Sequence, residues 1–220
     1  INILGGVSFV FDSVEPDPSL STVLDSILYA RENSVSGVIG FGGGSPMDVA
    51  KLTALILGSK QNLDDVWGVS NAHGPRVPLC LIPTTAGTGS EVTPVSIITI
   101  EGGEKRGVVS PIILPDLAIL DPSLTLGLPR STTAATGVDA MVHAIEAFAS
   151  ESLNNNYLSQ LMAREALVLL TNSIRRSVQN GKNIDARSEM LMGSMMAGMA
   201  FANSPVAAVH ALAYPLGGTF

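Results

Sequence analysis

Cysteine is almost absent from this chain of 220 residues, and charged and aromatic residues are few. The one cysteine, Cys80, cannot form an internal disulfide and lies in the apolar run VPLCLIP, so we expect a buried thiol in a reducing, cytoplasmic compartment. Lysine and arginine number 12 against 19 aspartates and glutamates, and no basic cluster stands out, which argues against a nucleic-acid partner. Gly, Pro or polar residues interrupt every apolar run before it reaches the length of a membrane span, and we recognise no signal peptide, so we expect no membrane partner.

Apolar residues are plentiful, at 46% of the chain, which is enough for the core of one large domain or two small ones. Up to Pro129, short apolar runs alternate with helical patterns and with Gly or Pro breakers, whereas long helical patterns with few breakers follow. We therefore predict an α/β domain over residues 1–129 and an all-helical domain over residues 130–220. Expected strands lie at 7–11, 37–41, 77–82 and 117–120, an expected hairpin joins 95–100 to 107–114, and expected helices cover 19–32, 46–57, 156–179 and 187–202.

A glycine cluster follows the second expected strand and precedes a helix. Gly42, Gly43 and Gly44 would let the backbone approach a pyrophosphate, and the helix that follows would point its free amides at that anion. Ser45 is a natural N-cap before Pro46, and Asp48 three residues later completes an arrangement that resembles a capping box. The spacing fits neither G-x-G-x-x-G nor a Walker loop, so the cluster predicts either a phosphate cradle or a tight structural turn.

Two further loops could contact a nucleotide. Asp12, at the carboxyl end of the first expected strand, could accept hydrogen bonds from ribose hydroxyls and would repel a 2′-phosphate, which predicts NAD over NADP; alternatively it caps the turn before Pro16. The loop after the third strand offers four hydroxyls among small residues, either to ribose and phosphate oxygens or to its own turn. These hydroxyls belong to Thr84, Thr85, Thr88 and Ser90.

A possible metal site lies in the second half of the chain. Thr136 and Gly137 read as the opening of a helix, on which Asp139 and His143 are four residues apart and so share one face. Two such ligands cannot hold a divalent ion alone, and His210 is the plausible third. His73 is followed by Gly and Pro and is expected to be a solvated loop residue. The alternative is that Asp139 caps a turn and His143 packs in the core.

Four segments in this order resemble the iron-containing (group III, metal-dependent) alcohol dehydrogenase family: GFGGGSPMDVAK, PTTAGTGSEVTP, TAATGVDAMVHAIEAF and VHALAYPLGG. The resemblance implies a Rossmann-like nucleotide-binding domain with a mostly parallel sheet, followed by an all-α metal-binding domain of the dehydroquinate synthase-like type. It implies that Asp139, His143 and His210 are metal ligands, and that a fourth ligand, a histidine, lies beyond Phe220. Both domains would then be incomplete in this chain, at the N-terminus of the first and the C-terminus of the second.

The resemblance also implies a reaction, in which NAD(P) reversibly oxidises a small alcohol to an aldehyde or ketone while a divalent metal, iron or else zinc, polarises the substrate oxygen. Tyr214 stands where the family often has a second histidine linked to substrate or proton transfer, so Tyr214 is the candidate catalytic residue, whose hydroxyl could bond a substrate or relay a proton. A homo-oligomer is also expected. The matching cofactor-binding positions are Asp12, Gly42, Gly43, Gly44, Ser45, Asp48, Thr84, Thr85, Thr88 and either Lys105 or Arg106.

Other readings keep most of these residues. A zinc polyol dehydrogenase or a hydroxyacid-oxoacid transhydrogenase would use a similar site within the same superfamily. A nucleotide-binding protein that no longer catalyses is the alternative of a different class, and it is favoured by the missing fourth ligand and by Tyr214.

Overall fold

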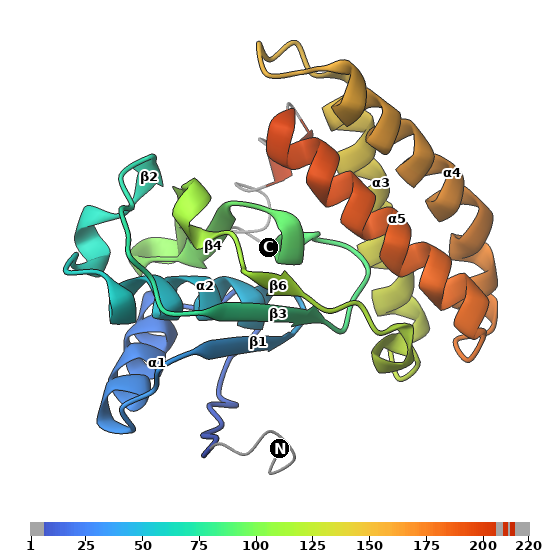
Figure 1. The fold of residues 1–220 in the computed structure, drawn as a ribbon. Helices are drawn as coiled ribbons and strands as arrows, with labels where there is room; N and C mark the ends of the chain where they lie inside the picture. The colour runs from blue at the N-terminus through green and yellow to red at the C-terminus, as the bar shows by residue number, and fades with distance from the viewer. Residues whose placement is uncertain (1–6, 206–208, 211, 214–220) are drawn as a thin grey trace.

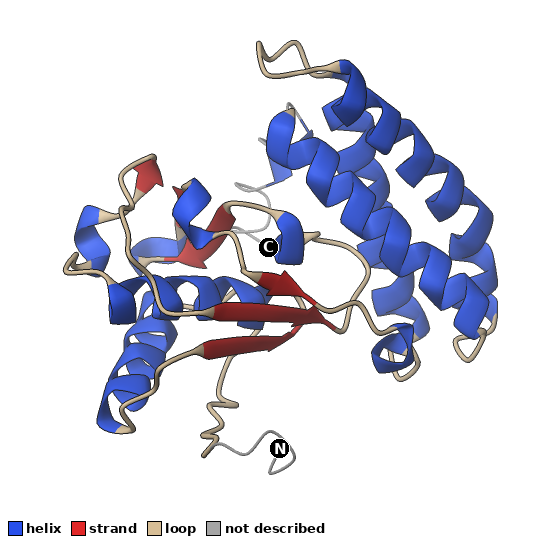
Figure 2. Ribbon diagram, in the orientation of Figure 1, coloured by secondary structure: helices blue, strands red, loops and turns tan. Residues whose placement is uncertain are grey.

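The computed structural model of the chain describes residues 7–205, 209, 210, 212 and 213. Strands and helices alternate in the first half, and three long helices lie side by side in the second (Figures 1 and 2). The helices are α1 (Leu20–Glu32), α2 (Gly44–Gly58), α3 (Arg130–Ala149), α4 (Tyr157–Gln179) and α5 (Ile184–Asn203). The strands are β1 (Val38–Gly42), β2 (Gly68–Val69), β3 (Leu79–Pro83), β4 (Val95–Thr99), β5 (Lys105–Val109) and β6 (Leu117–Ala118).

The strands form two small sheets. In the first, of order β1-β3-β6, all neighbours are parallel, and Gly40 pairs with Leu81. In the second, of order β2-β5-β4, β4 and β5 form the expected antiparallel hairpin and β2 runs parallel to β5. The prediction of a mostly parallel sheet is confirmed for the first of these sheets.

Helix α2 lies on one face of the parallel sheet. A side chain at Gly40 of β1 would meet Ala50 Cβ at 2.8 Å, so only glycine lets helix and strand approach this closely. Leu79 and Leu81 face α2 and are buried, whereas Ile39 and Phe41 on the other face are exposed. Cys80 also points away from α2 and is only partly buried, so the expectation of a core thiol was wrong.

Helices α3, α4 and α5 pack through small residues. At Gly193 of α5, for example, an added Cβ would lie 2.8 Å from Leu170 Cγ of α4. Small side chains at the contact bring helix axes close together, because the interaxial distance depends on the side chains between them. The buried alanines of this interface are Ala140, Ala144, Ala147, Ala163, Ala166, Ala197 and Ala200. Among the described helices, none is both long and apolar enough to cross a membrane.

Two helix starts differ from the prediction. Helix α3 begins at Arg130, six residues before the expected start at Thr136, because the hydroxyls of Thr133 and Thr136 donate to carbonyls four residues back and do not interrupt the helix. Helix α2 begins at Gly44 and its N-cap is Gly43, without a capping side chain, so the predicted Ser45 cap was wrong.

The expected strand at residues 7–11 is also absent. These residues have no regular structure, and Val7 and Val10 are 85% and 61% exposed. A strand needs a hydrogen-bonded neighbour, and no described strand pairs with the free edge of β1. The boundary near Pro129 remains a prediction; Pro129 directly precedes α3.

Candidate metal centre and nucleotide cleft

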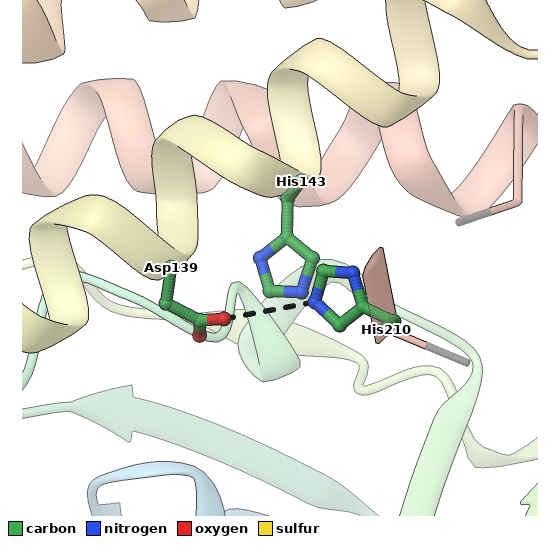
Figure 3. Close-up of side chains that lie close together, drawn as sticks. All are labelled: Asp139, His143 and His210. Carbon is green, nitrogen blue, oxygen red and sulfur yellow. Dashed lines mark ion pairs between the residues drawn. The ribbon is translucent and has the colours of Figure 1, made fainter. Parts of the chain in front are cut away.

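Three side chains from distant parts of the sequence meet at one point. Asp139 and His143 project from the same face of α3, and His210 approaches them from the segment after α5 (Figure 3). One ligand atom of each lies within 4.8 Å of the others, and Asp139 Oδ1 is 3.6 Å from His210 Nε2. The structure therefore brings together the three residues proposed from the sequence as metal ligands.

Glu146 holds His210 in place, and the sequence reading missed it. Its Oε2 lies 2.5 Å from His210 Nδ1, and its Oε1 accepts a hydrogen bond of 2.7 Å from the backbone N–H of Val209. A carboxylate on one imidazole nitrogen fixes the ring so that the other nitrogen, here Nε2, faces the cluster, as is usual around metal-binding histidines. The spacing along the sequence could have identified Glu146, because it follows Asp139 by seven residues and His143 by three and so lies on the same helix face.

The ring of His143 is enclosed. It stacks against Phe201 at 5.3 Å between centroids and against His210 at 4.4 Å, and its Nδ1 is buried without a hydrogen bond to any described residue. Burial lowers the pKa of His143, partly offset by the nearby carboxylate of Asp139, so the ring is held neutral.

Electrostatics around the other two potential ligands, Asp139 and His210, favour a carboxylate beside an imidazole. Burial alone would raise the pKa of Asp139, but its interactions with His210 and His143 hold it below its usual value. The interaction with Asp139 raises the pKa of His210 against the effect of burial, and Glu146 adds to this rise. A carboxylate oxygen and two imidazole nitrogens, without a thiolate, suit iron, zinc, manganese or cobalt. By the chemistry of this donor set, these residues fit a divalent metal.

A cleft of about 360 Å³ joins this cluster to the glycine loop. One side of the cleft is formed by the three potential ligands with Phe201 and Ala213. The other side is formed by the segment before α1, the start of α2, the loop after β3 and the β4–β5 hairpin. The residues on this second side are Asp17, Pro18, Gly44, Ser45, Asp48, Thr88, Ser90, Thr93, Val95, Ile97 and Lys105.

The loop after β3 that carries Thr84, Thr85 and Thr88, called the threonine loop below, lies directly against the glycine cluster at the start of α2. The backbone N–H of Thr84 donates to Gly42 O at 2.8 Å, and a Cβ added at Gly43 would lie 3.5 Å from Thr85 Oγ1. At Gly44 an added Cβ would be only 2.8 Å from Thr88 Cγ2. The predicted cradle residues are thus contiguous, but in the described part of the chain Gly42, Gly43, Thr84 and Thr85 do not line the cleft, whereas Gly44, Ser45, Asp48, Thr88 and Ser90 do.

Asp48 lines the cleft, but both of its carboxylate oxygens accept hydrogen bonds from other residues of the protein. Its Oδ1 accepts from Ser90 Oγ at 2.7 Å and its Oδ2 from Ile97 N at 2.9 Å, so the capping-box reading was wrong. Burial raises the pKa of Asp48, and Lys51, 3.9 Å away, opposes this rise. Asp48 therefore ties the start of α2 to the segment after the threonine loop.

Lys51 is fully buried behind the cleft. Its Nζ donates to Ser90 Oγ at 2.8 Å and to the carbonyls of Thr93 and Val95 at 3.0 and 2.7 Å. Burial lowers the pKa of Lys51 to about 8, although Asp48 and Glu91 act in the opposite direction. The sequence did not identify Lys51 as a buried residue, because a lysine within an expected helix is usually exposed on the surface.

Of the two basic residues left open by the sequence, Lys105 lines the cleft. Its Nζ lies 2.6 Å from Asp17 Oδ1 and donates to Thr99 Oγ1 at 3.0 Å. Arg106 instead pairs with Glu104 at 3.6 Å. Asp17, a second residue that the sequence reading missed, has a positive φ of 55° and donates its N–H to Ser45 Oγ at 3.3 Å.

The remaining predicted residues lie elsewhere. Asp12 is exposed and is not among the described residues that line the cleft. His73 is exposed in a loop, where its backbone N–H donates to Gln61 Oε1. Tyr214 falls outside the described residues.

Comparison with known proteins agrees with this architecture. A family model described as iron-containing alcohol dehydrogenase matches residues 2–122, and one for the C-terminal part of Fe-containing alcohol dehydrogenases matches residues 133–220. The chain belongs to the iron-containing alcohol dehydrogenase family. The predicted fold class, a Rossmann-like α/β part followed by a helical part, is that of the family and is confirmed.

Several members of the family are similar to this chain. Long-chain-alcohol dehydrogenase 1 of Geobacillus thermodenitrificans is 44% identical over 96% of this chain and 53% of its own length. The crystal structure of a 1,3-propanediol oxidoreductase, 37% identical, superposes with a TM-score of 0.91 over 96% of this chain and 55% of that one. Sulfoacetaldehyde reductase from Bifidobacterium kashiwanohense in complex with NAD+, 36% identical, gives a TM-score of 0.90 over 96% of this chain and 56% of that one. The chain thus spans about half the length of these members of the family.

Proposed function

We propose that this protein is a metal-dependent NAD alcohol dehydrogenase that interconverts a small alcohol and its aldehyde or ketone. The observation that carries this proposal is the cleft itself. It joins the glycine and threonine side, at Gly44 and Thr88, to three ligand atoms that lie within 4.8 Å of one another. A nucleotide held on one side and a substrate held by a metal on the other would meet in the same space.

Asp139, His143 and His210 would hold the metal, which when bound would act as a Lewis acid on the substrate oxygen. The residues around them have their own tasks. Glu146 keeps His210 Nε2 turned toward the cluster, and burial keeps His143 neutral so that its ring nitrogen is free to bind. The aromatic face of Phe201 covers His143 and excludes water from that side.

On the nucleotide side, the amides at the start of α2 favour a pyrophosphate, and Lys105 supplies the nearby positive charge. We propose NAD as the cofactor, because the carboxylate of Asp17 beside Lys105 would repel an added phosphate. From the sequence, the repulsion of a 2′-phosphate was predicted for Asp12, and that role of Asp12 stays a prediction. Fe2+ is the proposed metal, with Zn2+ as the second choice, since both accept one oxygen and two nitrogen ligands.

Metal analysis together with a nicotinamide absorbance assay tests the proposal. We expect approximately stoichiometric metal, NAD reduction with primary alcohols and diols, loss of that activity after chelation, and recovery when Fe2+ or Zn2+ is returned. NAD binding without bound metal and without turnover would instead identify a nucleotide-binding protein that does not catalyse.

Lys105 gives a sharper test of the nucleotide side. Replacing Lys105 by Met should weaken NADH binding about tenfold, because it removes a charged donor worth roughly 1.5 kcal/mol and leaves the Asp17 carboxylate unpaired in the cleft. Arg106→Met is the matched control, since Arg106 is the next residue but pairs with Glu104, and its NADH dissociation constant should stay close to that of the wild type. Equal weakening in both variants would contradict the assignment.

A further inference from the structure

The loop from Thr84 to Val92 touches both sides of the cleft. Toward the nucleotide side it contacts Gly42, Gly43 and Gly44 through its threonines, as described above, and Ser90 Oγ is held by Lys51 and donates to Asp48. These contacts fix one side of the loop to the start of α2 by hydrogen bonds and by close packing.

The other side of the loop is pressed against α3, which carries Asp139 and His143, and against α5, whose Phe201 stacks on His143. A Cβ added at Gly87 would lie 2.7 Å from Thr136 Cβ, one turn before Asp139 on α3. Two residues further on, Gly89 takes a left-handed φ of 59° and meets Gly198 of α5, where an added Cβ would lie 2.7 Å from Gly198 Cα. A Cβ added at Gly198 would in turn lie 2.9 Å from Gly89 Cα.

We propose that the contact between Gly89 and Gly198 sets the distance between the nicotinamide and the metal-bound substrate, so that both glycines are positioning residues for hydride transfer. This inference rests on the proposed function. Two backbones touch here with no side chain between them, and a backbone has no rotamer with which to absorb a change. A shift of α5 therefore passes directly into the loop that shapes the nucleotide cradle. Hydride transfer is sensitive to such shifts, because a misplacement of about 1 Å can lower the rate about 100-fold.

Gly198→Ala is the direct test. The residue lies inside α5, where alanine favours the helix, so any loss of function would not come from the helix itself. The added methyl requires the loop and α5 to separate by roughly 0.5 Å, from 2.9 Å to an ordinary contact of 3.4 Å. Gly127→Ala is the matched control, because nothing lies within 4 Å of a Cβ at that position.

We expect Gly198→Ala to keep its metal and its NADH dissociation constant, while kcat falls about 10- to 100-fold and the primary deuterium isotope effect rises. An independent readout needs no turnover. In protein loaded with Mn2+, paramagnetic relaxation of the nicotinamide protons of bound NAD should weaken in Gly198→Ala, because this relaxation falls steeply with distance. Gly127→Ala should match the wild type in every measurement, and Gly87→Ala should repeat the pattern from the other helical contact.

The outcomes separate clearly. Unchanged kcat and unchanged relaxation in Gly198→Ala would overturn the inference while leaving the proposed function intact. Loss of metal or of NADH binding in this variant would also overturn it, since the contact would then only support the fold. A wild-type protein that binds neither metal nor NADH would overturn the proposed function and this inference with it.

Discussion

Replacing His210 by alanine should strip the bound metal from the protein while leaving its fold in place. His210 is the one described ligand candidate outside α3, and without it Asp139 and His143 would hold an ion from a single helix face. We expect a loss of metal affinity of at least about 100-fold, and a similar loss for Asp139→Ala and His143→Ala, because each removes a ligand bond and part of the preorganised geometry. Metal content after purification and zinc titration against a chelator measure the loss of metal affinity. Circular dichroism measures whether the fold is retained.

Glu146→Gln refines the same test. The amide keeps the shape of the side chain but weakens its hold on His210 Nδ1, so metal affinity should fall by about 10- to 100-fold while all three ligands remain. His73→Ala is the control, since that histidine lies in an exposed loop and should change neither metal content nor rate. A metal that survives the loss of His210 would show that this residue only packs beside the site.

Lys51→Met should strongly destabilise the protein on the nucleotide side of the cleft. The buried ammonium donates to the carbonyls of Thr93 and Val95 and to Ser90, and it lies 3.9 Å from the Asp48 carboxylate. Methionine has a similar length but no donor, so these acceptors would stay buried and unpaired and Asp48 would lose its compensating charge. We expect a loss of about 3–5 kcal/mol in the free energy of unfolding, the range seen when one partner of a buried charge pair is removed.

Urea denaturation measures this loss, with Lys60→Met as the matched control on an exposed lysine. The control should change the free energy of unfolding by less than about 0.5 kcal/mol. A Lys51→Met protein as stable as the control would show that the ammonium does not hold the segment after the threonine loop.

The order of elements was predictable because apolar periodicity and breakers are local properties of the sequence. The alternation of strand and helix up to Pro129, the hairpin of β4 and β5, and the long helices after it were confirmed on that basis. Asp139 and His143 shared a face for the same local reason, since a spacing of four residues fixes their positions on any helix.

What the sequence did not reveal depends on contacts between distant segments. Glu146 acquires its role only when His210 folds back onto α3, and Lys51 is buried only because the loop at Ser90 covers it. Residues 7–11 have strand-like composition, but composition does not supply a pairing partner. Asp17 entered the cleft through a left-handed backbone conformation that no hydrophobic pattern records.

The alanine interface of α3, α4 and α5 reverses the usual tolerance of a protein interior to substitution. In most cores the costly change is truncation, because large side chains leave cavities. Here Ala140 and Ala144 of α3 are already minimal, so there is little to remove and no room to add, and any larger residue must push the helices apart. Ala144 directly follows His143, so such growth would also move a proposed metal ligand. Sequence drift at these positions is therefore confined to residues no larger than alanine, and the spacing of the proposed metal centre is maintained by side chains that are no larger than a methyl group.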